Sequence, residues 1–271
     1  MPFSPPSSSS EGDPVSLIRY VDIHKAFDQP VLTGVDLAVE EGEMFGIFGP
    51  SGTGKSVLLK STIGLLELDR GNVIVEGDPV YGGPRGTVQR VRRKVGYVFQ
   101  NAALFDSLNV WENVEMGIPE EEVQKLPRRE RTRKIWDSLE LVNLRPQEVL
   151  TKLPSELSGG MRKRVGIARA IVGRPRILLW DEPTTGLDPV NTAAVERLIE
   201  RLSGELRVTS IIVTHDIEGG LQMCGRVAML HSGVLRFCGT PEAFLASEDP
   251  LVRAFSDRSA AQAALDEAEV I

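Results

Sequence analysis

One stretch decides how this chain folds: MFGIFGPSGTGKS at residues 44–56. An apolar run typical of a strand leads into the pattern G-x-x-x-x-G-K-S, and a helix-forming run over residues 57–66 follows at once. A phosphate-binding P-loop requires this order of strand, loop and helix. A glycine-rich turn that merely preceded a helix would have no reason to place Lys55 and Ser56 in this register.

The loop is expected to hold a phosphate chain mainly through its backbone. Glycines leave the backbone free to turn its N–H groups inward, and the following helix presents its positive N-terminal end to the charge. Lys55 is expected to reach the β- and γ-phosphates, and the Ser56 hydroxyl is expected to ligate Mg²⁺. The candidate nucleotide-binding residues are Gly49, Pro50, Ser51, Gly52, Thr53, Gly54, Lys55 and Ser56.

Length and composition narrow the class of protein. The 271 residues suit one large domain or two closely packed lobes. The formal net charge of −7 argues against nucleic acid as the main ligand. The two cysteines cannot form a disulfide framework and are predicted to be small packing residues. No apolar run approaches the roughly 20 residues that span a bilayer, so a membrane role is expected to come through a partner.

Polar side chains follow three apolar strand-like runs. Gln100 ends the run 95–99, Asp181 and Glu182 end the run 177–180, and His215 ends the run 210–214. Ligands of open α/β sheets bind at the carboxyl ends of the strands. Gln100 is therefore expected to bond to Mg²⁺ or to the attacking water, Asp181 to organise Mg²⁺, and Glu182 to orient or deprotonate the water. The imidazole of His215 would sense or hold a γ-phosphate.

A second candidate anion site lies in the largely helical stretch between these strands. Helical spacing is seen over 110–114, 128–141 and 161–172, which predicts a second lobe inserted between the nucleotide-handling halves. Ser158 is a good N-cap for the last helix, and the free N–H groups at that helix start would attract an anion.

The order of the motifs resembles that of the ATP-binding subunits of ABC transporters, over residues 17–245. GPSGTGKS is similar to the Walker A motif of that family, and ILLWDE at 177–182 is similar to its Walker B strand with the catalytic glutamate. Gln100, LSGGM at 157–161, TGLD at 185–188 and His215 resemble its Q-loop, signature, D-loop and switch histidine. The signature departs from the usual pattern by ending in Met161 where glutamine is more common.

The resemblance implies an α/β P-loop NTPase fold, with a mixed-sheet core, N-terminal antiparallel β-strands and an inserted α-helical subdomain. The expected nucleotide-binding core, RecA-like with its β subdomain, is 15–100 with 175–245, and the expected helical signature subdomain is 101–174. The Ser- and Pro-rich residues 1–14 are expected to be disordered. Residues 246–271 form a C-terminal extension, whose end is either an interaction arm or a frayed end.

The resemblance also implies ATP and Mg²⁺ as cofactors and a head-to-tail dimer that holds two nucleotides. Phe27 would stack on the adenine. The ATP held by one copy would meet the signature of the other copy, so the implied second half of each site is Ser158, Gly159, Gly160 and Asp188. Hydrolysis would release the dimer.

A finer resemblance concerns the transported substrate. SELSGGM at 155–161, the stretch 100–114 and DPLVRAF at 249–255 are similar to the Mla/Mce-type ATPases that power phospholipid movement between bacterial membranes. The implied partners are a second copy, integral membrane permease subunits and an Mce-type lipid-binding subunit, with no nucleic acid. The implied location is the cytoplasmic face of the inner membrane, held through the permease.

One alternative function remains open, and two others do not fit the motifs. The runner-up is the ATPase of another ABC system, a small-nutrient importer or an exporter. A soluble ABC ATPase acting on DNA or ribosomes would carry a long coiled coil or two ATP-binding domains, and this sequence has neither. A small-molecule kinase with a P-loop would not explain LSGGM or His215.

Overall fold

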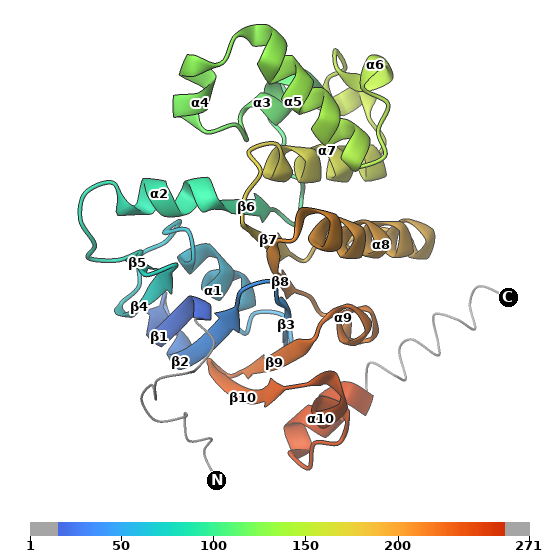
Figure 1. The fold of residues 1–271 in the computed structure, drawn as a ribbon. Helices are drawn as coiled ribbons and strands as arrows, with labels where there is room; N and C mark the ends of the chain where they lie inside the picture. The colour runs from blue at the N-terminus through green and yellow to red at the C-terminus, as the bar shows by residue number, and fades with distance from the viewer. Residues whose placement is uncertain (1–15, 258–271) are drawn as a thin grey trace, which may run out of the picture. The chain divides into compact units, whose positions relative to one another are not determined.

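The computed structural model describes residues 16–257, which fall into two compact units (Figure 1). The first unit contains the described residues of 1–91 and 211–271, and the second unit is 92–210. The segment 1–14, predicted to be disordered, and the tail beyond residue 257 lie outside the described residues. The predicted helical insertion, 101–174, lies inside the second unit.

The first unit opens with an antiparallel sheet. It consists of β1 (Ser16–Ala26), β2 (Pro30–Glu40), β4 (Arg70–Val75) and β5 (Asp78–Pro79), in the order β2-β1-β4-β5. Ile18, Tyr20 and Ile23 of β1 are buried, and a shift of register between Tyr20 and Ile23 accommodates the break in alternation. The predicted N-terminal antiparallel strands are confirmed.

A mixed sheet follows in the same unit. The strand β3 (Met44–Phe48) pairs in parallel with β9 (Arg226–His231), and β9 pairs antiparallel with β10 (Val234–Gly239). Phe45, Ile47 and Phe48 are fully buried, as expected of a parallel strand covered on both faces. The helices of the unit are α1 (Lys55–Ser61), α9 (Ile217–Met223), α10 (Pro241–Leu245) and residues 250–257.

Two elements contain the points where the chain passes between the units. They are α2 (Thr87–Lys94) and β8 (Thr209–Val213). The basic stretch 89–94 forms most of α2, because Val91 packs into the interior while the arginines remain exposed.

The second unit combines two parallel strands with a set of helices (Figure 1). Its strands are β6 (Val95–Val98) and β7 (Ile177–Asp181). Its helices are α3 (Val110–Glu115), α4 (Glu120–Lys125), α5 (Arg128–Leu141), α6 (Pro146–Val149), a 3-10 turn (Pro154–Glu156), α7 (Gly159–Ile171) and α8 (Pro189–Leu206). α7 packs against α3 and α5, and the buried Asn113 amide bonds the carbonyls of Phe105, Leu108 and Asn109.

The predicted helix after the P-loop was too long. It was expected over 57–66, but α1 ends at Ser61. Gly64 adopts a positive φ of 59°, and the N–H of Leu65 turns back to the carbonyl of Lys60. Leu65 and Leu66 extended the helical pattern in the sequence, but Leu65 is largely exposed and adds no buried face.

The two cysteines are free thiols, as the sequence analysis expected. Cys224 is buried, and burial raises its pKa to about 12. Cys238 is half-buried, and burial raises its pKa although the neighbouring Arg226 opposes the shift. Within residues 16–257, no helix has the length and apolar character needed to cross a membrane.

Candidate functional site

The P-loop of the first unit depends on glycine at two positions. Gly49 has a φ of 148°, and a Cβ there would lie 2.1 Å from the carbonyl oxygen of Leu230. Gly54 has a φ of 97°, and a Cβ there would lie 2.7 Å from Leu32 Cδ2. Any larger residue would push the loop away from β9 or β2, so the loop path requires glycine.

The Lys55 ammonium group is held across this loop. Its Nζ donates to the carbonyl oxygens of Gly49 at 2.7 Å and Pro50 at 2.9 Å, and the side chain is buried. The hydroxyl of Thr53 also donates to the carbonyl of Pro50, at 2.9 Å. Ser56 follows Lys55 in the first turn of α1 and is half-buried. The Lys55 ammonium group therefore lies against the backbone of the loop. Its hydrogen bonds go to carbonyl oxygens in this structure and would go to phosphate oxygens in a nucleotide complex.

Two further candidates belong to the first unit. Phe27 lies in the turn between β1 and β2, with 62% of its surface exposed and the ammonium of Lys25 5.3 Å from its ring centroid. His215 follows β8 and is exposed, one residue before Asp216 caps α9. Both side chains lie at surfaces where a ligand could reach them.

Asp181 ends β7 in the second unit and is almost completely buried. The phenol of Tyr97, on the neighbouring strand β6, donates to Asp181 Oδ2 at 2.8 Å. This bond fixes one carboxylate oxygen in place. No local pattern in the sequence marks Tyr97, since only the pairing of β6 with β7 brings residues 97 and 181 together.

Glu182 adopts a left-handed backbone conformation, with a φ of 46°. Such a conformation costs a non-glycine residue roughly 1–3 kcal/mol and is concentrated at functional sites. Its Oε2 accepts from the Thr185 hydroxyl at 2.9 Å and from the Gln100 amide at 3.3 Å. The structure thus joins two predicted site residues, Gln100 and Glu182, and Thr185 positions the carboxylate.

Lys163 is a second residue that sequence reasoning missed. It lies in α7, its side chain is buried, and its ammonium donates to the carbonyl of Gln100. Burial lowers the pKa of Lys163, while the carboxylates of Asp181 and Glu182 oppose the shift. No sequence signal could have found Lys163, because its partner carbonyl lies 63 residues away.

The signature segment and the D-loop meet within the second unit. The Ser158 hydroxyl caps α7 by accepting from the N–H of Met161 at 3.3 Å, which confirms the predicted N-cap. Asp188 caps α8, and the N–H and side-chain amide of Asn191 lower the pKa of its carboxyl. A Cβ on Gly160 would lie 3.3 Å from Asn191 Oδ1, so the two helix starts are neighbours. Ser158, Gly159 and Asp188 are exposed there.

The predicted magnesium ligands are a hydroxyl, an amide and a carboxylate, from Ser56, Gln100 and Asp181. Mg²⁺ prefers oxygen ligands of this kind and usually keeps waters and substrate phosphates in its shell. Within residues 16–257, no group of three or more His, Cys, Asp or Glu side chains is placed to hold a metal alone. The chemistry of each of these three side chains suits Mg²⁺.

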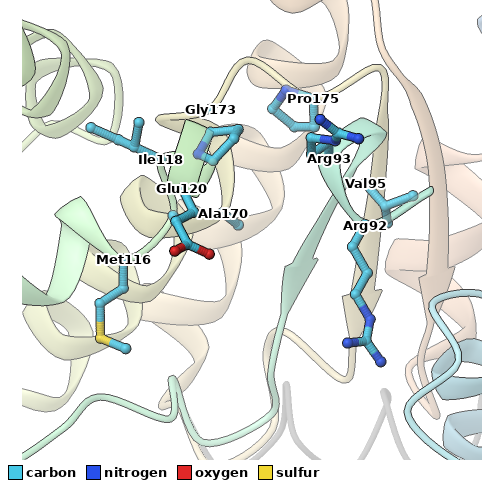
Figure 2. A pocket seen from close by; sticks show the side chains of 11 residues that line it. Arg92, Arg93, Val95, Met116, Ile118, Glu120, Ala170, Gly173 and Pro175 are labelled. Atoms are coloured by element: carbon cyan, nitrogen blue, oxygen red, sulfur yellow. The ribbon is translucent and has the colours of Figure 1, made fainter. Parts of the chain in front are cut away.

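A cavity of about 240 Å³ lies on the second unit, and none of the predicted site residues lines it (Figure 2). It combines apolar and charged side chains, including Met116, Ile118 and Glu120 at one side and Arg92, Arg93 and Val95 at the other. Met116 is 54% exposed.

The chain is similar in sequence to proteins of known function. The family model described as "ABC transporter" matches residues 32–185. The chain is 39% identical to the ribonucleotide transport ATP-binding protein mkl of Mycobacterium tuberculosis over 92% of this chain and 69% of that protein. It is 37% identical to the spermidine/putrescine import ATP-binding protein PotA of Trichormus variabilis over 82% of this chain and 56% of that protein.

Solved structures agree with the sequence relatives. CbiO1 from Clostridium perfringens, part of an ABC transporter complex, matches with a TM-score of 0.75 and 28% identity over 93% of this chain and 99% of that one. A dimeric ATP-binding cassette in a post-hydrolysis state, bound to ADP and Pi, matches with a TM-score of 0.73 and 29% identity over 83% of this chain and 98% of that one. The predicted P-loop NTPase fold is confirmed.

Proposed function

This chain belongs to the ABC transporter family as an ATP-hydrolysing subunit, and from that premise we propose that it powers phospholipid movement between bacterial membranes. The support for the lipid substrate is the likeness of segments 100–114, 155–161 and 249–255 to the Mla/Mce-type ATPases. The alternative is a small-nutrient importer. It is favoured by the names of two relatives, which are a spermidine/putrescine importer and a methionine importer.

The proposed hydrolytic centre begins with nucleotide binding at the P-loop. Lys55 and the loop N–H groups bind the β- and γ-phosphates, and Phe27 stacks on the adenine. Mg²⁺, held by Ser56, Gln100 and Asp181 with the phosphates, supplies charge neutralisation when bound. The observation that carries the assignment is the orientation of the Glu182 carboxylate by Gln100 and Thr185, because a base must be fixed to act on a water. His215 contacts the γ-phosphate.

Each site is proposed to be shared by two copies of the chain. The exposed starts of α7 and α8 offer N–H groups and the Ser158 hydroxyl to an anion, and Asp188 lies beside them. Two similar structures are dimeric ATP-binding cassettes. We infer that the ATP on the P-loop of one copy is completed by Ser158, Gly159, Gly160 and Asp188 of a second copy.

A disulfide cross-link tests this dimer. With both native cysteines replaced by alanine, cysteines at positions 51 and 158 are expected to bridge two copies when ATP is bound to a Glu182→Gln background. The physical reason is that a disulfide requires Cα atoms within about 7 Å. Non-reducing electrophoresis of two differently tagged copies measures the bridge.

The matched control places the second cysteine at the exposed Ser155 instead of Ser158. That pair is expected to give no nucleotide-dependent bridge. Bridging of positions 51 and 158 only within single copies, or with equal yield without ATP, would refute the head-to-tail dimer.

The permease is proposed to dock on the second unit at the cavity of Figure 2. The exposed Met116 supplies apolar contact, and Arg92 and Arg93 supply charge at its edge. Interfaces commonly combine an apolar centre with arginines in this way. This docking would hold the chain at the cytoplasmic face of the inner membrane.

Purification from the native membrane tests both partner and substrate. The tagged wild-type chain is expected to bring down a permease and a single-pass, Mce-type lipid-binding subunit, identified by mass spectrometry. Met116→Arg is expected to lose the permease, because it places a charge at the apolar contact. Leu153→Arg, at a different exposed apolar residue of the same unit, is the matched control and should keep it. Recovery of a periplasmic amino-acid or polyamine receptor instead would overturn the lipid proposal.

A further inference from the structure

A second cavity of the second unit is lined by arginines. Its volume is about 300 Å³, and it lies where the end of α5 meets α7 and α8. The lining residues are Asn143, Arg164, Ala194, Arg197, Leu198 and Arg201. None of the residues proposed for ATP hydrolysis lines this cavity, so it needs a separate explanation.

The local structure holds two of the guanidinium groups in place. Asn143 follows α5 in a left-handed conformation, which presents both its carbonyl and its side chain to the cavity wall. Arg201 Nη2 donates to the Asn143 side-chain oxygen at 3.3 Å and to the carbonyl of Leu141. Arg164 Nη1 donates to the Asn143 carbonyl at 3.5 Å. These bonds use only part of the five N–H donors of each guanidinium.

Arg197 is the third arginine that lines the cavity, and it belongs to α8. It lies one turn before Arg201, and residues four apart share a helix face. Arg197 is exposed and makes no hydrogen bond or ion pair within residues 16–257. Glu200 lies between the two arginines in sequence but does not line the cavity. Arg197 therefore has its donors available to a ligand.

The charge of the cavity is opposite in sign to the net charge of the whole chain. Three guanidinium groups line it and no carboxylate does, although the chain has a formal net charge of −7. Like charges gathered in one cavity repel, and an anion between them would remove that cost. The two arginines bonded to Asn143 cannot swing freely away, so the arrangement is preorganised for an anion.

We propose that this cavity binds a phosphate group. A phosphate monoester offers three oxygens in a tetrahedral arrangement and up to two negative charges, which suits donors that converge from three side chains. A carboxylate offers two coplanar oxygens and one charge, so it would satisfy at most part of the set. The source of the phosphate is either the free anion or the headgroup of a phosphatidic-acid-like lipid.

The bound phosphate would connect two helices, α7 and α8, which begin at the exposed signature and at the exposed D-loop. Arg164 belongs to α7, which begins after Ser158, and Arg197 and Arg201 belong to α8, which begins after Asp188. A phosphate bonded to all three would tie these helices to each other and to the end of α5. We therefore expect binding to stabilise the folded chain against heat.

Calorimetric titration with inorganic phosphate tests the site on the full chain. Saturating Mg²⁺–ADP is added first so that the P-loop is filled, and the ionic strength is held constant with sodium chloride. Wild type is expected to bind one phosphate and to show a raised Tm. Arg197→Gln is expected to bind about tenfold more weakly, because it removes one charge-assisted partner. Since Arg197 has no bond to the rest of the described chain, this variant should fold normally.

The matched control is Arg133→Gln, which removes the same charge from an exposed position of α5. Phosphate binding should be unchanged in this variant. No binding beyond the filled P-loop, or equal weakening in both variants, would overturn the proposal, as would binding of a polyglutamate peptide in place of phosphate. Flotation with vesicles containing phosphatidic acid distinguishes the source. Competition by these vesicles identifies the lipid, and failure to compete identifies the free anion.

Discussion

Replacing Glu182 with glutamine is expected to slow ATP hydrolysis by about 10²–10⁴-fold, the usual contribution of a positioned general base. Each tenfold loss corresponds to about 1.4 kcal/mol of barrier. Glutamine keeps an oxygen that can accept from Thr185 and Gln100, so the geometry should survive while the negative charge is lost. ATP binding should remain near wild type, because the phosphate-binding loop is untouched. Steady-state phosphate release and nucleotide titration measure the two quantities separately.

The control for this substitution is Glu205→Gln, at an exposed position of α8. It makes the same change of charge in the same unit and should leave turnover unaltered. Hydrolysis near the wild-type rate in Glu182→Gln would remove Glu182 from the mechanism. A parallel loss of ATP affinity would instead mean that the carboxylate supports binding.

Replacing Lys55 with alanine is expected to weaken ATP binding by roughly 10–100-fold and to abolish measurable turnover at ordinary ATP concentrations. A hydrogen bond to a charged partner contributes about 1.5–3 kcal/mol, and each 1.4 kcal/mol changes the Kd tenfold. The substitution also removes the bonds to the carbonyls of Gly49 and Pro50, which hold the loop in shape. Fluorescence titration with a nucleotide analogue measures the affinity directly.

Lys60→Ala is the matched control, since Lys60 lies in the last turn of the same helix, α1. This variant should bind ATP as wild type does, because the change lies away from the loop. If Lys55→Ala retained both affinity and turnover, the assignment of residues 49–56 as the nucleotide site would fail. Circular dichroism should show that both variants remain folded.

The local motifs were readable from the sequence because each depends on neighbours in the chain. The P-loop combines a strand, glycines and a helix start within residues 44–61, and the backbone geometry follows from those residue types. The predicted cap at Ser158 likewise involves a partner three residues away. Nearest-neighbour chemistry of this kind survives in any fold that keeps the segment intact.

Element ends were less predictable, since they depend on packing. The sequence pattern carried the first helix to residue 66, but α1 stops at Ser61, where the chain turns at Gly64. The helix over 87–94 is short, half of its residues are basic, and only Thr87 and Val91 are buried. Two buried positions are too few to define a helical period from the sequence alone.

The α/β class, the position of the phosphate-binding loop and the identities of the candidate catalytic groups could be read from the sequence, because these follow from contiguous patterns. How those groups are held depends on the fold. Tyr97 bonds Asp181, Lys163 bonds the carbonyl of Gln100, and three arginines from α7 and α8 surround one cavity. The two bonds join residues 84 and 63 positions apart, and the cavity gathers side chains from separate helices. No local pattern in the sequence specifies which distant partner the folded chain will supply.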